Sequence, residues 1–195
     1  MTEFRDPTGW MRAAAIGLCA YILLRGLFAI LLVAAPGDSR TGPVAIAYLV
    51  ALFVCYILVG GWIYRANANA HVFSSEMTIT PGWAIGWFFV PFGNLIMPYE
   101  GVKETWEQSH RHAGLYRDAE DYWLLRWWWG LWLASNILTY IISLFRGADP
   151  DAAWRLGYAN LLAAAGSCAA GVVLILIMRS ICRAQLVASR GSVFA

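Results

Sequence analysis

Side chains capable of chemistry are scarce in this sequence, and the most conspicuous is an arginine inside an apolar run. Arg25 lies near the middle of the stretch 13–35, whose other residues are apolar or small. A charged side chain at the centre of a membrane-spanning helix costs at least about 2.5–3.5 kcal/mol on insertion scales, so it should face the interior of a helix bundle. Arg25 is therefore a candidate binding residue for an anion or a lipid headgroup. The alternative is a structural contact between helices.

No Asp or Glu occurs within the long apolar stretches, so the partner of Arg25 must be an amide side chain or an acidic residue from another segment. Asn94 lies between two prolines, where a broken helix exposes carbonyl groups and helix ends that can coordinate ions. Glu100 follows shortly after. The amides of two further residues are alternatives, Asn136 and Asn160. We therefore expect a binding site built from Arg25, Asn94 and Glu100.

The histidines form a weak metal-like grouping. His110 and His112 follow Glu104 and Glu107, and Glu107 to His110 has the i, i+3 spacing of carboxylate-bridged metal sites. Such sites need a second copy of the motif and further carboxylates, which this sequence does not supply. No histidine lies in an apolar stretch to ligate a haem, and motifs of nucleophilic, phosphate-binding and dithiol enzymes are missing. We expect no metal, no cofactor and no enzymatic activity.

The composition is that of an integral membrane protein. Hydrophobic residues make up 60% of the 195 residues and charged residues 13%, whereas soluble domains usually carry about 45–50% and about 25%. With 14 Lys and Arg against 12 Asp and Glu, the net charge of +2 is too small for a nucleic-acid-binding surface. The 4 cysteines lack the regular spacing of a disulfide or zinc framework.

Apolar stretches long enough to cross a bilayer define the predicted fold. A hydrocarbon core of roughly 30 Å takes about 20 helical residues, and the stretches that qualify are 13–35, 44–64, 127–145 and 157–178. Prolines and glycines separate the first stretch from the second, and a proline separates the third from the fourth, so each pair should form a hairpin. The prediction is an all-α, polytopic membrane helix bundle of two hairpins, forming a single domain over residues 1–195.

The segment 80–99 is apolar enough to enter a membrane, but its interior prolines and a Gly-Asn pair exclude one straight helix. Charge bias indicates whether it crosses, because cytoplasmic loops collect Lys and Arg. If the segment does not cross, ten basic residues outside the spans lie on one side and three lie on the other, namely Arg40, Arg146 and Arg155. If it crosses, the better orientation gives only eight against five. We expect a re-entrant or interfacial segment, then an amphipathic helix over 99–109, with both termini cytoplasmic.

Two further patterns concern packing. Tryptophans at predicted span ends, among them Trp62 and the run 127–129, are expected to form an aromatic belt at headgroup depth. The fourth stretch is rich in small residues, which let helix backbones approach closely. Gly166, Ala170 and Gly171 are therefore expected to form a helix-packing interface, either at the bundle centre or against a partner.

A series of short motifs links the second apolar stretch to the predicted amphipathic helix. In order they are Trp62-Ile63-Tyr64-Arg65-Ala66, Asn69-Ala70, Thr80-Pro81-Gly82-Trp83, Gly86-Trp87-Phe88-Phe89-Val90-Pro91-Phe92, Asn94-Leu95, Pro98-Tyr99 and Glu104-Thr105-Trp106. This order resembles the bacterial membrane family known as domain of unknown function 4328, over roughly residues 62–109. The resemblance implies a multi-span bacterial membrane protein and supplies no activity, substrate or cofactor.

The patterns favour a non-enzymatic protein of the bacterial inner membrane that acts through association. It would be an accessory or scaffold subunit of a membrane complex, or a lipid-binding module, because its surface is apolar and its spans hold almost no ionisable groups. The expected partners are membrane lipids and a membrane protein or second copy of the chain, but not nucleic acid. The alternative is a small transporter or channel-like protein with a site around the broken segment.

Overall fold

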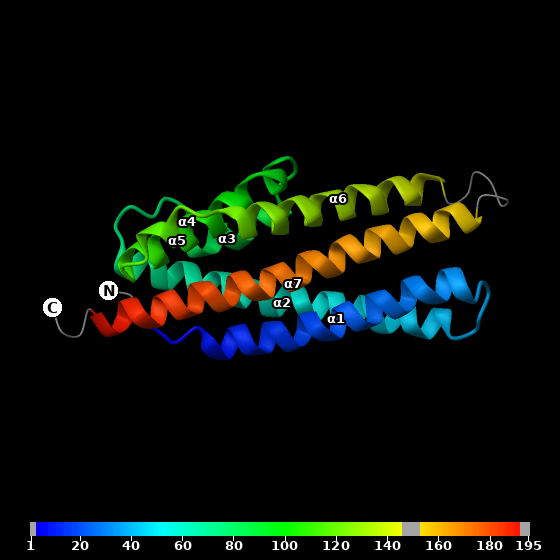
Figure 1. Cartoon of the computed structure of the whole chain (residues 1–195), viewed down its shortest axis with the longest axis horizontal. Helices are drawn as coiled ribbons and strands as arrows, with labels where there is room; N and C mark the ends of the chain where they lie inside the picture. The colour runs from blue at the N-terminus through cyan, green and yellow to red at the C-terminus, as the bar shows by residue number, and fades with distance from the viewer. Residues whose placement is uncertain (1–2, 146–152, 192–195) are drawn as a thin grey trace.

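The structure, a computed structural model, describes residues 3–145 and 153–191, which form helices and short turns. Within these ranges, four helices are long and apolar enough to cross a membrane. They are α1 (Thr8–Ala34), α2 (Thr41–Phe73), α6 (Trp123–Phe145) and α7 (Ala153–Gly191). In Figure 1, α1 ends, α2 begins, α6 ends and α7 begins at one end of the bundle. The chain is thus a multi-pass helix bundle of two antiparallel pairs, as predicted.

Two of these helices are longer than a membrane is thick. At about 1.5 Å per residue, the 33 residues of α2 and the 39 residues of α7 extend roughly 50 and 58 Å. A bilayer with its headgroups measures about 40–45 Å. The predicted spans 44–64 and 157–178 therefore end before the helices do. The extra turns lie at the end where α1 begins, which we call the terminal end, and the opposite end is the hairpin end. The predicted connection between α6 and α7, with Arg146, lies outside the described residues.

The region between the two pairs contains five further elements. These are α3 (Pro81–Gly86), the 3-10 turns η1 (Trp87–Phe89) and η2 (Gly93–Leu95), and α4 (Met97–His112), followed by α5 (Tyr116–Ala119). α3 and α4 both pack against α2, and α4 also packs against α7, so the segment reverses direction without crossing the bundle (Figure 1). At the reversal Phe92 has φ of +61°, a left-handed conformation that non-glycine residues seldom adopt.

The amphipathic helix predicted after the broken segment corresponds to α4. Val102 and Trp106 lie four residues apart, on one face, and are 3% and 4% exposed. Lys103 and Glu107 point away from that face and are only half-buried. α4 therefore covers the terminal end of α2 and α7 with its apolar side.

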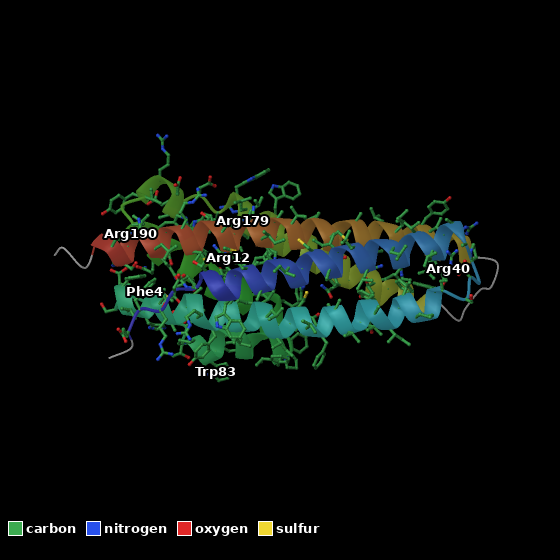
Figure 2. All side chains as sticks on the ribbon, turned by 90° about the horizontal axis from the view of Figure 1, so that it is seen from below. Phe4, Arg12, Arg40, Trp83, Arg179 and Arg190 are labelled. Atoms are coloured by element: carbon green, nitrogen blue, oxygen red, sulfur yellow. The ribbon has the colours of Figure 1, made fainter. Side chains whose placement is uncertain are left out.

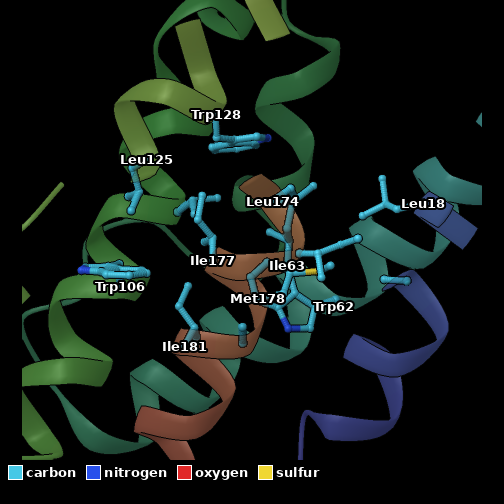
Figure 3. Packing of buried hydrophobic residues seen from close by; sticks show 14 of the residues in the cluster. Leu18, Trp62, Ile63, Trp106, Leu125, Trp128, Leu174, Ile177, Met178 and Ile181 are labelled. Carbon is cyan, nitrogen blue, oxygen red and sulfur yellow. The ribbon is translucent and has the colours of Figure 1, made fainter. Parts of the chain in front are cut away.

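The hydrophobic core is concentrated where α4 closes over the long helices. Figure 3 shows Trp62, Trp106, Leu125, Ile177 and Ile181 converging from α2, α4, α6 and α7. The side chains of Leu125, Ile177 and Ile181 are 0% exposed, and that of Trp62 is 1% exposed. Because α2, α4, α6 and α7 all contribute to it, this core joins the two helix pairs to the helix that follows the broken segment.

The predicted aromatic belt is wrong for three of its members. Trp62, Trp128 and Trp129 are buried in the core at 1%, 3% and 7% exposure, and Trp62 Nε1 donates a hydrogen bond to Cys182 Sγ at 3.4 Å. Only side chains on the outside can contact headgroups, and among the predicted members Trp123 and Trp127 are 59% and 48% exposed. The position of each tryptophan along the chain did not distinguish the buried tryptophans from the exposed ones.

The small residues of α7 pack inside the chain. Gly166 faces Ser135 of α6, Gly171 faces Ile22 of α1, and Ala170 is 2% exposed. These residues therefore lie at the bundle centre, one of the two positions expected for them. The apolar surface left uncovered belongs mainly to α2, whose most hydrophobic window is only 6% buried, compared with 39% for α7.

The four long helices do not close into a ring. α1 packs against α2 and α7, and α7 packs against α6, so the order across the bundle is α2, α1, α7, α6. Over the described residues, α2 and α6 make no extended contact with each other. The broken segment fills the space between them at the terminal end, where Phe88 meets the tryptophans of α6.

Candidate binding site

A cavity of about 160 Å³ lies between α2 and α6, where these helices stand apart. All four long helices contribute to its wall, together with η1 of the broken segment. The lining residues are Leu18, Tyr21, Arg25, Tyr48, Leu52, Cys55, Tyr56, Val59, Phe88, Trp128, Trp132, Ser135, Asn136, Thr139, Ser167, Ala170, Gly171 and Leu174.

The floor of this cavity is buried and its rim is exposed. Cys55 and Ser135 at the floor are 4% and 5% exposed. At the rim, Tyr56 of α2 and Asn136 and Thr139 of α6 are exposed. Because the exposed residues belong to the two helices that stand apart, the cavity opens sideways between them. In a membrane, this side of the bundle faces the lipid chains.

Arg25 lies in the wall of the cavity and is only 4% exposed. Its Nη1 donates a hydrogen bond to Asn160 Oδ1 at 2.9 Å, and Nη2 donates to the backbone oxygen of the same residue at 3.5 Å. The guanidinium carbon also lies 5.5 Å from the centre of the Tyr48 ring, a cation–π contact. In the described part of the chain, no carboxylate forms an ion pair with it. The buried cation is therefore held by neutral groups.

Polar lining residues are concentrated toward one end of the cavity and apolar ones toward the other, with residues such as Leu52 and Tyr56 between them. The order of residues along the antiparallel helices shows which end each one is nearer. Toward the hairpin end lie Arg25, Tyr48, Asn136, Thr139 and Ser167. Toward the terminal end lie Leu18, Val59, Phe88, Trp128 and Leu174. The cavity thus has the polarity of an amphiphile.

The broken segment closes the apolar end of the cavity. The Phe88 ring packs edge-on against Trp129 and Trp132, with centroids 6.4 and 6.3 Å away and planes at 79° and 90°. The two tryptophan rings stack on each other at 4.8 Å. Trp129 Nε1 also donates a hydrogen bond to the Leu95 carbonyl oxygen at 2.9 Å, which ties η2 to α6. Aromatic contacts therefore hold the reversal of the chain against the bundle.

The structure separates the three residues predicted to form one site. Arg25 lines the cavity, whereas Asn94 and Glu100 do not. Asn94 is half-buried in η2, and Glu100 forms an ion pair with Lys103 at 3.3 Å at the start of α4. The partner of Arg25 is Asn160, which the sequence offered only as an alternative. The site that the structure presents therefore combines Arg25 with residues of α2, α6 and α7.

A buried polar network at the terminal end has no clear signal in the sequence. Gln185 of α7, 0% exposed, donates from Nε2 to the Ala66 carbonyl at 2.7 Å and to Ser109 Oγ at 3.0 Å. Its Oε1 accepts from Asn69 Nδ2 at 3.0 Å, and Asn69 exchanges two hydrogen bonds with the backbone of Arg5. The network joins α2, α4, α7 and the chain start. Asn69 lies beyond the predicted span 44–64, but α2 continues through it and the side chain is buried.

The two histidines of α4 make structural contacts. His110 is 1% exposed, with Nδ1 2.7 Å from the Trp106 carbonyl oxygen and Nε2 2.9 Å from Ser180 Oγ of α7. Burial lowers the pKa of His110 below its usual 6.5, so the ring is neutral at pH 7. His112 Nδ1 lies 2.9 Å from the Gln108 carbonyl oxygen. Among the described residues, no three His, Cys, Asp or Glu side chains converge as a metal site.

The comparison with known families covers most of this architecture. A family model described as Domain of unknown function (DUF4328) matches residues 30–183. The chain belongs to this family. DUF4328 here spans α2 to α6 and most of α7, well beyond the motifs at 62–109, and the match begins after Arg25. No curated protein and no solved structure matches the chain. Because the DUF4328 description assigns no activity, a function must be argued from the cavity itself.

Proposed function

We propose that this multi-pass protein binds a lipid-like molecule in the cavity between α2 and α6. The observation that carries the proposal is the position of the opening. The exposed rim residues Tyr56, Asn136 and Thr139 lie on the sides of two membrane-spanning helices. A molecule dissolved in the bilayer can reach such an opening without leaving the membrane. Ligands of this kind are amphiphiles with a long apolar part.

The volume of the cavity limits how much of the ligand it encloses. An apolar cavity of about 150 Å³ in another protein accommodates a molecule the size of benzene. The present cavity of about 160 Å³ therefore holds a head group and the first part of a chain. The rest of the molecule extends through the opening between α2 and α6 into the bilayer.

The lining supports binding rather than catalysis. Among the described residues around the cavity there is no His, Asp, Glu or Lys. The hydroxyl groups of Ser135 and Thr139 donate to backbone carbonyls one turn earlier, at 2.6 and 2.8 Å, and no base lies beside them to activate them. A non-enzymatic role is therefore part of the proposal.

The proposed setting is the bacterial inner membrane, with both chain ends on the cytoplasmic side. Figure 2 shows Arg12, Arg179 and Arg190 toward the terminal end and Arg40 at the hairpin end. Cytoplasmic ends of spans collect Lys and Arg, which supports this orientation. The uncovered apolar face of α2 also leaves room for a membrane partner, so the lipid-binding module would be compatible with an accessory subunit of a larger complex.

Native mass spectrometry of the protein, gently extracted from its own membranes, tests the proposal. We expect one small, reproducible adduct on the wild-type chain. Thr139→Trp places a large ring at the rim and should remove the adduct, whereas Ile137→Trp, on an exposed part of α6 that does not line the cavity, should keep it. An adduct that is insensitive to Thr139→Trp, or no adduct at all, would contradict the proposal.

Transport around the broken segment is a second candidate, because Phe88 of that segment lines the cavity. Phe88 lies between the cavity and the terminal end, so a path to that side would require its displacement. In proteoliposomes loaded with a fluorescent fatty acid, Phe88→Ala should then increase release of the probe relative to wild type. If neither protein releases the probe faster than empty liposomes, binding without transport is favoured.

A further inference from the structure

We infer that the ligand of this cavity is an anionic amphiphile with a small head group, a long-chain carboxylate, whose charge pairs with Arg25. The inference rests on the proposed function and adds the charge, the size of the head group and the direction of the ligand. Three observations carry it: the unneutralised charge of Arg25, its depth, and the polarity of the cavity.

The charge of Arg25 lacks a counter-ion within the described bundle. Arg25 is 4% exposed, and its hydrogen-bond partner Asn160 and ring partner Tyr48 are both neutral. Burying a cation without an opposite charge is expensive, and the hydrocarbon around the bundle offers no water to reduce the cost. A bound anion supplies the missing charge, so an anionic ligand gains an interaction that a neutral one cannot make.

The guanidinium retains hydrogen-bonding capacity for such a ligand. An arginine carries five N–H donors in a planar fork that matches the two oxygens of a carboxylate. Asn160 accepts from Nη1 and Nη2, through its side-chain and backbone oxygens, and these are the hydrogen bonds found for Arg25. The remaining donors belong to a group that lines the cavity and can be used by an oxyanion there.

The depth of Arg25 favours a small head group. It lies nine residues before the end of α1 at Ala34, which is about 14 Å along the helix. This distance is close to half of the roughly 30 Å hydrocarbon core. A bulky zwitterionic phospholipid headgroup would have to leave the interface to reach it. A single carboxylate is smaller and loses less hydration.

The polarity of the cavity orients the chain. The head group lies near Arg25 and Thr139, toward the hairpin end, and the first methylenes lie toward Leu18 and Phe88 at the terminal end. This is the direction of lipids in the leaflet at the hairpin end, with head group and tail in the same order. A ligand from that leaflet can enter between α2 and α6 without turning over.

The test compares probes that differ only in head group, using the full chain in a neutral maltoside detergent. Palmitate, methyl palmitate and hexadecyl phosphate are titrated, and the bound fraction is measured by native mass spectrometry. Because a hydrogen-bonded ion pair is stronger than a neutral contact, we expect wild type to bind palmitate at least about ten-fold more tightly than its methyl ester. Tighter binding of hexadecyl phosphate than of palmitate would overturn the carboxylate assignment.

Variants assign the preference to Arg25. Arg25→Gln should bind palmitate no better than the ester, Arg25→Lys should keep a preference for palmitate, and Arg12→Gln, an exposed position on the same helix, should behave as wild type. Equal binding of palmitate and ester by wild type would overturn the inference and leave the proposed function standing, and this comparison needs no variant to fold. If wild type binds none of the three probes and carries no adduct from its own membranes, the proposed function itself is contradicted.

Discussion

Gly166 of α7 lies so close to Ser135 of α6 that a Cβ atom on residue 166 would overlap the serine hydroxyl oxygen. Ser135 Oγ meanwhile donates a hydrogen bond to the Leu131 carbonyl at 2.6 Å and lines the cavity. In membranes, helices associate through close backbone contacts at small residues, since burial of apolar surface brings no gain over lipid. This contact therefore sets the separation of α6 and α7 and one wall of the proposed site.

Gly166→Ala should destabilise the bundle by about 1–3 kcal/mol, the usual cost of overpacking a tight contact. Ser135→Ala in the same chain should restore most of the stability, because Ser135 Cβ lies 3.7 Å from the added Cβ, an ordinary contact distance. The measurement is the thermal unfolding midpoint in detergent. Gly130→Ala on α6 is the matched control, since an added Cβ there meets nothing within 4 Å. If Gly166→Ala and Gly130→Ala lower the unfolding midpoint equally, the packing argument is contradicted.

Gln185→Leu should loosen the docking of α4 onto α2 and α7. The substitution removes the amide that donates to the Ser109 hydroxyl and the Ala66 carbonyl and that accepts a hydrogen bond from Asn69. Leaving a buried polar group unpaired costs about 1–3 kcal/mol. We expect faster amide hydrogen exchange in α4 while α1 stays protected. Arg183→Gln, an exposed position on the same helix, should leave the exchange unchanged. Uniformly faster exchange in all helices would argue against a local role.

His110 should make stability depend on pH. Its pKa is lowered in the folded protein by burial, so the unfolded chain binds more protons at acidic pH. The stabilisation from neutral His110 is therefore complete above the unfolded pKa of 6.5 and is lost as the pH falls below it. The difference in unfolding free energy between wild type and His110→Gln should shrink on acidification from pH 7.

The control for this prediction is His112→Gln, which removes an exposed imidazole from the same helix. Unfolding is followed at several pH values between 7 and 5 in the same detergent. If the difference between wild type and His110→Gln stays constant across that range, burial of a neutral His110 does not contribute to the pH dependence.

Labelling with a membrane-impermeant maleimide should distinguish the two ends of the bundle. In a background without the native cysteines, Ser39→Cys between α1 and α2 should react in intact cells. Arg117→Cys on α5 is exposed at the terminal end and should react only after the cells are permeabilised. The reverse pattern would invert the proposed orientation. Reaction of both cysteines in intact cells would mean that the broken segment does not return to its own side.

The membrane spans could be predicted from hydropathy, because hydropathy depends only on the composition of one helix. The predicted stretch 127–145 falls inside α6, and the stretch 13–35 passes the end of α1 by a single residue. The prolines around Asn94 marked the break that η1 and η2 form. Side-chain direction was less accessible to sequence reasoning. The run 127–129 was predicted to lie at the membrane surface, yet Trp128 and Trp129 face the core and only Trp127 is exposed. Successive residues of a helix point in directions about 100° apart, so neighbours in sequence contact different parts of the molecule.

The sequence by itself determined that the chain is a membrane bundle of four long helices in two pairs, and that a charged Arg25 must face inward. These conclusions follow from local hydropathy, helix breakers and the cost of a charge in hydrocarbon. Only the tertiary structure decided that Arg25 meets Asn160 rather than Asn94 or Glu100, and that α2 and α6 stand apart. Both depend on how α1 and α7 pack, and that contact joins residues far apart in sequence, which no local pattern specifies.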